Sequence, residues 1–258
     1  AAEDARPEDI AKAEAAAKRG RGKDKAKPAP PADPIYPART LTFNGQDFPS
    51  VAFRPDRPVA DLIIKAIGAA KTSIDISLYE FRNREILKAL REAKARGVKI
   101  RVLVDFGNTF PGKRDDSSYW PSRSLELQSL ISEGFDVSII RGTEKWGIAH
   151  NKLAVFDGSF AVMGSYNWSY TSENNHFENL VFTDSKKTIA GMQAYWDWMR
   201  TLSVPFDKAR SHAWPQTVPA PPQDPAPSVS FNGETLPSFA FSPDLAVEDA
   251  VVRALGAA

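Results

Sequence analysis

The chain has 258 residues, 42% of them apolar and 25% charged, and its 33 basic side chains nearly balance 32 acidic ones. That length allows one large domain or two small ones. Cysteine is absent, which excludes a disulfide scaffold, a thiolate zinc site and a catalytic thiol. Three histidines are too few to favour a metal centre built from imidazoles, and no apolar run reaches the ~20 residues needed to cross a bilayer.

Residues 1–37 predict a disordered, basic and proline-rich tail. Large apolar side chains are too rare there to offset the entropy lost on ordering. The basic run 18–27 is expected to be a solvated linker, with contact to a phosphate or a membrane surface as the alternative. The first 34 residues hold 8 of the basic and 7 of the acidic side chains, which leaves 25 of each. The remainder of the chain is therefore neutral overall.

Residues 38–214 predict one α/β unit. Asn44-Gly45 between apolar residues signals a hairpin. Apolar stripes at helical spacing predict helices over 59–70, 85–96, 124–133 and 185–202. Alternating or continuous apolar runs predict strands over 74–78, 98–105, 137–140, 150–156, 160–167 and 177–183, with a long loop over 105–123.

Residues 215–228 predict a proline-rich linker, because proline at that density favours an extended spacer. After it, residues 229–258 repeat residues 41–70 at a constant offset of 188, with 15 of 30 positions identical. This predicts the beginning of a second unit whose strands lie outside these residues. The chain is then either a fragment of a two-unit protein or a product that a partner completes.

One cluster of polar residues is expected on a pair of neighbouring strands. His150 and Lys152 point to the same face because side chains alternate along a strand. A two-residue type II′ turn at 158–159 would place residues whose numbers sum to 317 opposite each other. His150 then faces Asn167, and Lys152 faces Ser165, with Cβ atoms about 4.5–5.5 Å apart.

The chemistry of this cluster suits a phosphoryl group. Lysine supplies a positive charge, and the hydroxyl and carboxamide supply neutral donors for phosphate oxygens. A neutral imidazole can attack phosphorus and form a phosphohistidine, and no metal is required. The second ring nitrogen must be held, and Glu178 is the expected partner, with Glu173 as the alternative.

The spacing His150-x-Lys152-x4-Asp157, followed by Gly164-Ser165-x-Asn167, resembles the HKD signature of the phospholipase D superfamily. The stretch 164–179 is similar to the longer form found in its bacterial endonuclease and cardiolipin-hydrolase branches. The resemblance spans roughly residues 40–205.

The resemblance implies a mixed β-sheet flanked by helices. Activity in this superfamily needs two HKD motifs that meet at a pseudo-twofold axis, from one chain or from two, and no cofactor. One histidine forms the covalent phospho-intermediate, while the other protonates the leaving alcohol and later activates water. These 258 residues contain one such motif, so the chain is expected to supply a first half-site. A C-terminal continuation or another chain would supply the second.

The site residues implied by the resemblance each take a role. His150 is the expected nucleophile, and Glu178 orients it. Phosphate would be bound by Lys152, Ser165 and Asn167. Asp157 belongs to the motif, but is expected to act as a structural hydrogen-bond partner more than as a reacting group.

The substrate remains open between two classes. A phospholipid head-group phosphodiester is favoured, because a neutral folded part lacks the net basic groove that tracks nucleic acid. The endonuclease-like signature keeps nucleic acid as the alternative, and a non-catalytic phosphate-binding module is a third possibility. A cysteine-free chain with this tail slightly favours a secreted or periplasmic protein.

Overall fold

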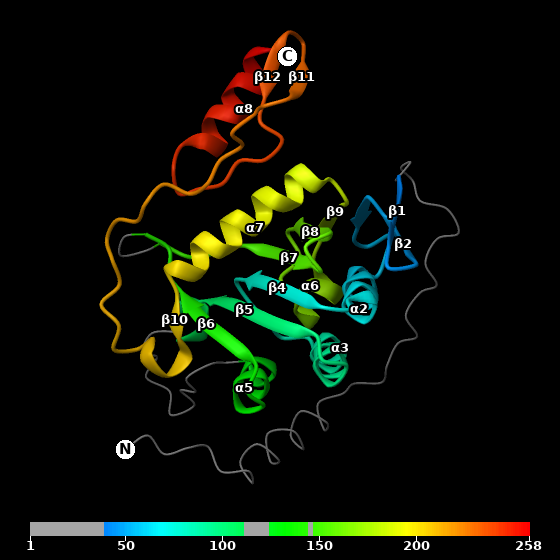
Figure 1. Ribbon diagram of the computed structural model, residues 1–258, viewed down its shortest axis with the longest axis vertical. Coiled ribbons are helices and arrows are strands. Elements are labelled where there is room, and N and C mark those ends of the chain that lie inside the picture. Colours follow the sequence, from blue (N-terminus) through cyan, green and yellow to red (C-terminus); the bar gives the residue numbers. More distant parts are fainter. Residues whose placement is uncertain (1–38, 111–123, 144–146) are drawn as a thin grey trace. The chain divides into compact units, whose positions relative to one another are not determined.

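The computed structural model describes residues 39–110, 124–143 and 147–258 (Figure 1). The predicted tail, residues 1–37, lies outside this range. The centre of the fold is an eight-stranded sheet in the order β10-β6-β5-β4-β7-β8-β9-β3. A separate hairpin, β1-β2, precedes it, and a second hairpin, β11-β12, comes near the C-terminal end of the chain.

The elements have the following bounds. The strands of the large sheet are β3 Val51–Phe53, β4 Ser73–Leu78, β5 Lys99–Asp105, β6 Asp136–Ile140, β7 Lys152–Phe156, β8 Phe160–Gly164, β9 Asn179–Thr183 and β10 Val204–Pro205. The hairpins are β1 Thr40–Phe43 with β2 Gln46–Pro49, and β11 Val229–Phe231 with β12 Glu234–Leu236. The helices are α2 Val59–Ala69, α3 Arg84–Ala95, α4 Phe106–Thr109, α5 Leu125–Ser132, α6 Tyr170–Asn175, α7 Lys186–Thr201, the 3-10 turn η1 Phe206–Lys208 and α8 Ala246–Gly256.

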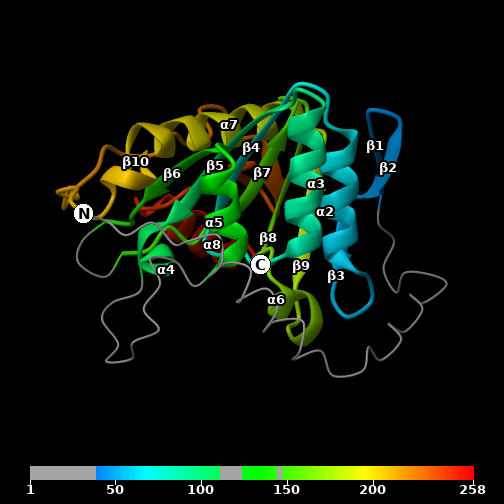
Figure 2. The same ribbon diagram turned by 90° about the horizontal axis from the view of Figure 1, so that it is seen from below.

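The large sheet is mixed, as expected. Strands β4, β5 and β6 are parallel, whereas β7 joins β4 antiparallel, with Leu78 opposite Lys152. Helices α2, α3 and α5 cover one face of the sheet and α7 covers the other (Figure 2). The longer helices form because their apolar residues recur on one side, and the first turns of α3, α5 and α7 are also capped by a side chain. In α3, for example, the Asn83 side chain accepts hydrogen bonds from the backbone N–H groups of Glu85 and Ile86.

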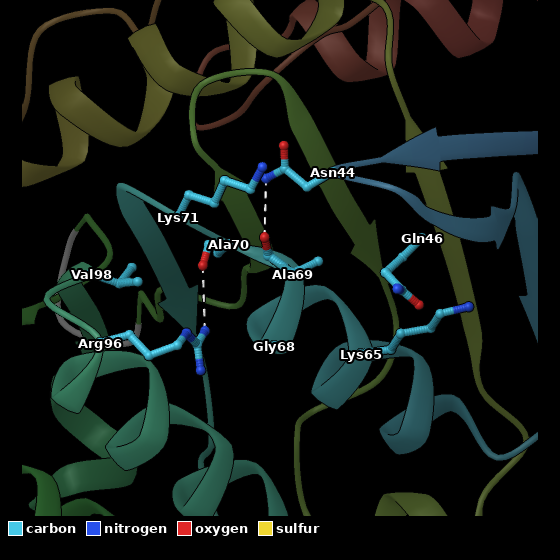
Figure 3. A pocket seen from close by; sticks show the side chains of 9 residues that line it. All are labelled: Asn44, Gln46, Lys65, Gly68, Ala69, Ala70, Lys71, Arg96 and Val98. Atoms are coloured by element: carbon cyan, nitrogen blue, oxygen red, sulfur yellow. Dashed lines mark hydrogen bonds between the residues drawn. The ribbon is translucent and has the colours of Figure 1, made fainter.

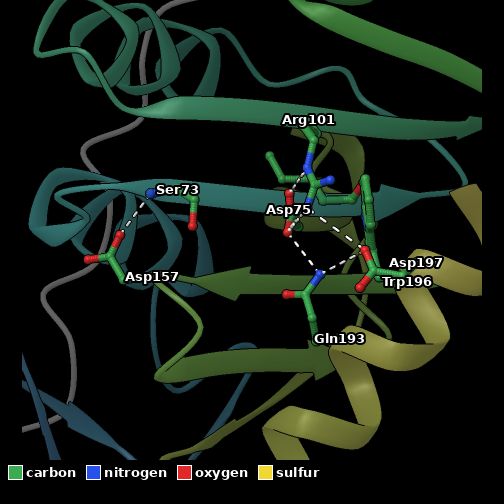
Figure 4. A network of polar contacts seen from close by, with 8 residues as sticks. Ser73, Asp75, Arg101, Asp157, Gln193, Trp196 and Asp197 are labelled. Atoms are coloured by element: carbon green, nitrogen blue, oxygen red, sulfur yellow. Dashed lines mark hydrogen bonds and ion pairs between the residues drawn. The ribbon is translucent and has the colours of Figure 1, made fainter.

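The core has two parts, one on each face of the sheet. On the α2 side, phenylalanine rings join the first hairpin to the sheet: Phe43 stacks on Phe160 with ring centroids 4.9 Å apart, and Phe48 contacts Phe182 at 5.6 Å. On the α7 side, a polar contact crosses the layers. Arg101 donates two hydrogen bonds of 2.6 Å to buried Asp75, and its guanidinium lies 4.3 Å from the ring of Trp196 (Figure 4).

The predicted elements and the observed ones differ near the polar cluster. Strand β8 ends at Gly164, not Asn167, and β9 begins at Asn179, not at 177. Between them the short helix α6 replaces part of an expected connection. The predicted loop over 105–123 begins with the short helix α4, and residues 111–123 lie outside the described range. None of the described helices combines the length and apolar character needed to span a membrane.

Candidate active site

Strand β7 carries the motif, with its reacting residues at one end. It lies between β4 and β8, and all five of its residues are buried. His150 and Lys152 lie at its start, where β4 ends, and Asp157 follows its last residue. The length of the strand therefore separates Asp157 from His150.

The predicted register of the β7–β8 hairpin is wrong by one residue. Phe156 pairs with Phe160 and Leu153 with Met163, so opposite residues sum to 316. The turn is Asp157-Gly158, both with positive φ, closed by a 3.0 Å hydrogen bond from the Ser159 N–H to the Phe156 carbonyl. Ser159 is then an extra residue, and continuing this register places Gly164, not Ser165, opposite Lys152.

Asp157 explains the choice of turn. Its carboxylate accepts hydrogen bonds from the backbone N–H groups of Lys71, Thr72 and Ser73 and from the Asn44 side chain, all within 3.2 Å (Figure 4 draws the bond from Ser73). Burial raises its pKa, but these donors outweigh burial and lower the pKa below its ordinary value. These contacts hold the left-handed residue in place, and they belong to the framework at the opposite end of the strand from His150.

Lys152 is a buried cation whose side chain is hydrogen-bonded to the backbone of His150. Its Nζ donates a 2.8 Å hydrogen bond to the carbonyl of His150 and lies 5.2 Å from the ring centroid of Tyr79. Burial lowers the pKa of Lys152 to about 8, against the raising effect of the Glu178, Glu80 and Asp105 carboxylates. At neutral pH the side chain therefore remains mostly charged, and it presents a poorly hydrated ammonium to an anion.

The side chain of His150 is exposed to solvent, but one side of its ring packs against Tyr79. The ring meets Tyr79 edge to face, with centroids 4.8 Å apart. Desolvation, and then the charge of Lys152, lower the pKa of His150 below 6.5. The imidazole is therefore uncharged at neutral pH, which is the state that can attack phosphorus.

The backbone leading to His150 is anchored by Asp105. One carboxylate oxygen of this fully buried residue accepts a 2.8 Å hydrogen bond from the Ala149 N–H, and the other accepts a 2.7 Å bond from the Asn108 N–H. Asp105 ends β5, two strands away from β7. It thereby ties the segment that carries His150 to the centre of the parallel half of the sheet.

Glu178 lies just before β9 and contacts Ser165 and His176. Its carboxylate accepts a short hydrogen bond from the Ser165 hydroxyl, and its other oxygen lies 3.5 Å from Nδ1 of His176. Ser165 Oγ also accepts a 3.0 Å bond from the Asn179 N–H. The structure thus joins Ser165 to Glu178, and the role of Glu178 in orienting His150 stays a prediction.

Asn167 and Glu173 complete the predicted set. Asn167 is half-buried, and its Oδ1 is a buried atom without a hydrogen-bond partner among the described residues. Glu173, the alternative partner for His150, is buried and accepts a 3.0 Å bond from the Ala60 N–H at the start of α2. Its carboxylate therefore serves the first turn of a helix.

Two hollows differ in what they offer a ligand. One, of about 290 Å³, has His150 and Asn151 at its edge, and its apolar wall includes Ile148, Tyr195, Trp198 and Leu202. The other, of about 600 Å³, lies beside the end of α2 and includes Lys65, Lys71 and Arg96 (Figure 3). There, Lys65 and Arg96 already donate to backbone carbonyls, at 2.7 Å and 2.9 Å, so this second hollow is not assigned a ligand.

Two residues that shape the site were missed by the sequence analysis, Tyr79 and Asp105. Tyr79 directly follows one predicted strand and Asp105 ends another. Their contacts with His150 and Ala149 arise because β5, β4 and β7 are neighbours in the sheet although they are far apart in the sequence. Among the described residues, no group of three or more histidine, aspartate or glutamate side chains is placed to hold a metal ion.

The sequence of this chain is similar to those of several known proteins. The profile of a family described as "Cardiolipin synthase, PLD-like domain" matches residues 63–200, more than half of the chain. "Phospholipase D" of Rickettsia prowazekii (strain Madrid E) is 28% identical over 155 residues, which cover 60% of this chain and 68% of that protein. "Mitochondrial cardiolipin hydrolase" of Xenopus laevis is 25% identical over 161 residues, 62% of this chain and 68% of that protein.

A solved structure gives a consistent result. NucT from Helicobacter pylori superposes with a TM-score of 0.52 at 25% identity, over 60% of this chain and 96% of that one. The matched stretches span about two thirds of the curated relatives' own length.

Proposed function

Because the chain belongs to the family of phospholipase D-like domains, and is on that ground a phosphodiesterase, we propose that it acts through a phosphohistidine formed on His150. The observation that carries this proposal is the pairing of an exposed, neutral imidazole with a buried ammonium two residues further along the chain. The substrate we propose is a phospholipid head-group phosphodiester, and this chain supplies one of two half-sites.

The chemistry assigns each group a step. A ring nitrogen of His150 forms a bond to phosphorus while the bond from phosphorus to the leaving oxygen breaks. Lys152 and the carboxamide of Asn167 stabilise the negative charge on the remaining phosphate oxygens, and Ser165 joins them by turning its hydroxyl proton from Glu178 to the phosphate. The leaving alkoxide needs a proton, which the imidazole of a second half-site gives, and that same group then activates the water that releases phosphate from His150.

The hollow beside His150 supports a lipid over a nucleic acid. Its apolar wall suits the acyl or glycerol part of a phospholipid, and the neutral balance of residues 35–258 offers little attraction to a polyanion. A nuclease activity is the second candidate, favoured by the endonuclease-like form of the motif.

The first test uses bis(p-nitrophenyl) phosphate in EDTA. Because p-nitrophenolate leaves without a proton donor, one half-site suffices to form the intermediate. We expect a burst of one p-nitrophenolate per active chain and a p-nitrophenyl phosphoryl group on His150 by mass spectrometry at neutral pH. His150→Ala should abolish the burst and His176→Ala should preserve it. A burst that EDTA removes, or a label on His176, contradicts the mechanism.

The second test decides the substrate class by competition. Phosphatidylcholine vesicles should suppress the burst, whereas plasmid DNA at the same phosphate concentration should have little effect. The opposite order would assign the chain to nucleic-acid phosphodiesters. Suppression by neither, with the burst intact, would leave the phosphohistidine chemistry standing and reject both proposed substrates.

A further inference from the structure

The last 30 residues reproduce the local structure of residues 41–70. Asn44 and Asn232, 188 positions apart, both have positive φ, 46° and 45°. Nδ2 of Asn44 donates to the Ala69 carbonyl at 3.0 Å, and Nδ2 of Asn232 donates to the Ala257 carbonyl at 2.9 Å. Each hairpin is therefore fastened to the end of its own helix by the same contact.

A second contact recurs at the same offset. Nζ of Lys65 donates to the Asp47 carbonyl at 2.7 Å, and the guanidinium of Arg253 donates to the Thr235 carbonyl at 2.7 Å. Arg253 also pairs with Glu234 at 2.8 Å. The hairpin β11-β12 and the helix α8 are thus an assembled unit, bound together by polar contacts on one side.

The two copies differ in what happens to their apolar side. In the first copy, Ile63 and Ile67 are 0% exposed and Phe43 is 4% exposed. Their counterparts Val251, Leu255 and Phe231 are 53%, 71% and 39% exposed. The same surface that is covered in one copy is open in the other.

The cover in the first copy is the sheet. Phe43 stacks on Phe160 and contacts Phe156 at 6.2 Å, and these rings belong to one packed cluster with Ile63 and Ile67. We call the corresponding open surface of the second copy the C-terminal face. It consists of Val229, Phe231, Val247, Val251, Val252 and Leu255. Val247, Val251 and Leu255 recur every fourth residue along α8 and so share one side of that helix, and exposed apolar side chains gathered in this way mark an interaction site.

We propose that the C-terminal face binds the sheet of a second phospholipase D-like unit, in which residues 229–258 take the place that residues 41–70 take in the first. A second copy of this chain does not fit, because its own residues 41–70 already cover its sheet. The occupant is therefore a distinct sheet with aromatic rings placed as Phe156, Phe160 and Phe182 are placed here. This proposal concerns packing and does not depend on the phosphohistidine chemistry.

The test is a graft within the complete chain, in which the sequence of residues 229–258 replaces residues 41–70. If the C-terminal face fits such a sheet, the graft unfolds in one cooperative thermal transition and keeps the near-ultraviolet circular dichroism of the unaltered chain. A matched graft that carries Val251→Asp should lose that transition. Two unfolded grafts, or two equally stable ones, overturn the proposal.

A second measurement on the ungrafted chain checks that the face is open. The double variant Val251→Asp with Leu255→Lys should reduce the fluorescence of bound anilinonaphthalene sulfonate at least twofold and leave the melting temperature unchanged. Ile63→Asp is the buried control and should lower the melting temperature strongly. If the double variant lowers the melting temperature as strongly as Ile63→Asp does, the C-terminal face is already covered within the chain, which contradicts the proposal.

Discussion

The ammonium of Lys152 is the residue on which the proposed chemistry depends most directly. Its pKa, lowered by burial to about 8, is close enough to neutrality that modest alkali removes its charge. The imidazole of His150 has the opposite requirement, because it must be unprotonated to attack and its pKa lies below 6.5. The two groups together define the pH range in which both are in their working states.

The first prediction is therefore a bell-shaped pH dependence. The burst rate should rise as His150 loses its proton below pH 6.5 and fall as Lys152 loses its proton near pH 8. Lys152→Arg keeps a charge at all these pH values, so its alkaline limb should vanish even if its maximum is lower. Stopped-flow release of p-nitrophenolate between pH 5 and 9.5 measures both. An unchanged alkaline limb in the variant would assign that limb to another group.

The second prediction concerns Gly164 at the end of β8. A Cβ added there would meet the Asn179 carbonyl oxygen at 2.1 Å, so the backbone of β9 must move. Overpacking of this kind costs about 1–3 kcal/mol. Gly164→Ala should lower the free energy of unfolding in urea by that amount, whereas Gly68→Ala, at an open position, should not. Equal stabilities would mean that the two strands separate easily at this point.

At this scale the sequence predicted the motif residues but not their exact neighbours. The spacing from His150 to Asp157 predicts a phosphate site because its pattern is local, and that role stays a prediction. The register failed because the left-handed Asp157 is held by donors about 85 positions away in the chain. Tyr79 reaches His150, and Asp105 reaches Ala149, through strand pairing, which a local pattern does not encode.

At the scale of elements, the cluster around Asp75 is one of the polar contacts that hold α7 to the sheet. Asp75 in β4 is nearly fully buried and receives both Arg101 and the Gln193 side chain, the latter at 3.0 Å. Arg101 stacks on Trp196 of α7. Since α7 also lines the hollow beside His150 through Tyr195 and Trp198, this contact positions a wall of the proposed site.

The third prediction removes the cation from this contact. Arg101→Leu leaves the Asp75 carboxylate buried without its partner, which costs about 3–5 kcal/mol. The free energy of unfolding should fall by that amount. The double variant Arg101→Leu with Asp75→Leu should recover most of the loss, because the buried charge is gone. If the double variant is no more stable than the single one, the loss comes from packing against Trp196.

The long elements were predictable and the short ones were not. Helices α2, α3 and α7 begin and end within about a residue of the predicted limits, because each has a sustained apolar stripe. The six-residue α6 was missed, since Tyr170–Asn175 is short and mostly polar. Its signal was Ser169, whose side chain caps the first turn by accepting from the Ser172 N–H.

For the whole molecule, charge balance separates the two candidate substrates. Basic and acidic side chains are equal in number from residue 35 onward. A protein that neutralises several phosphates of a nucleic acid loses affinity steeply as salt displaces it, by about 10³-fold or more between 50 and 200 mM for six or more contacts.

The fourth prediction follows from that balance. The burst rate constant with phosphatidylcholine as competitor, and the affinity for those vesicles, should change less than about threefold between 50 and 200 mM salt. A zwitterionic surface and an apolar hollow depend little on screening. A steep salt dependence in vesicle co-sedimentation would instead indicate binding through a charged surface such as the basic run 18–27.

The global arrangement could be predicted only as far as the α/β class and, through the family resemblance, the mixed sheet. The sequence analysis predicted helices and strands alternating through residues 59–140 but no strand directions, and the structure shows β4, β5 and β6 to be parallel. Which strand receives β7 depends on pairing across the whole unit. Residues 229–258 show the reverse case, since their hairpin and helix follow from sequence alone, but the sheet that would cover them does not.

The position of β7 in the middle of the sheet limits how the protein can change. The four apolar side chains of this strand, Leu153 to Phe156, are buried between β4, β8 and the flanking layers, so substitutions of them destabilise the fold before they alter the chemistry. New preferences for one phosphodiester over another would therefore arise in the segments around His150, such as the wall formed by α7. Directed evolution of this enzyme would best randomise that wall and leave the strand untouched.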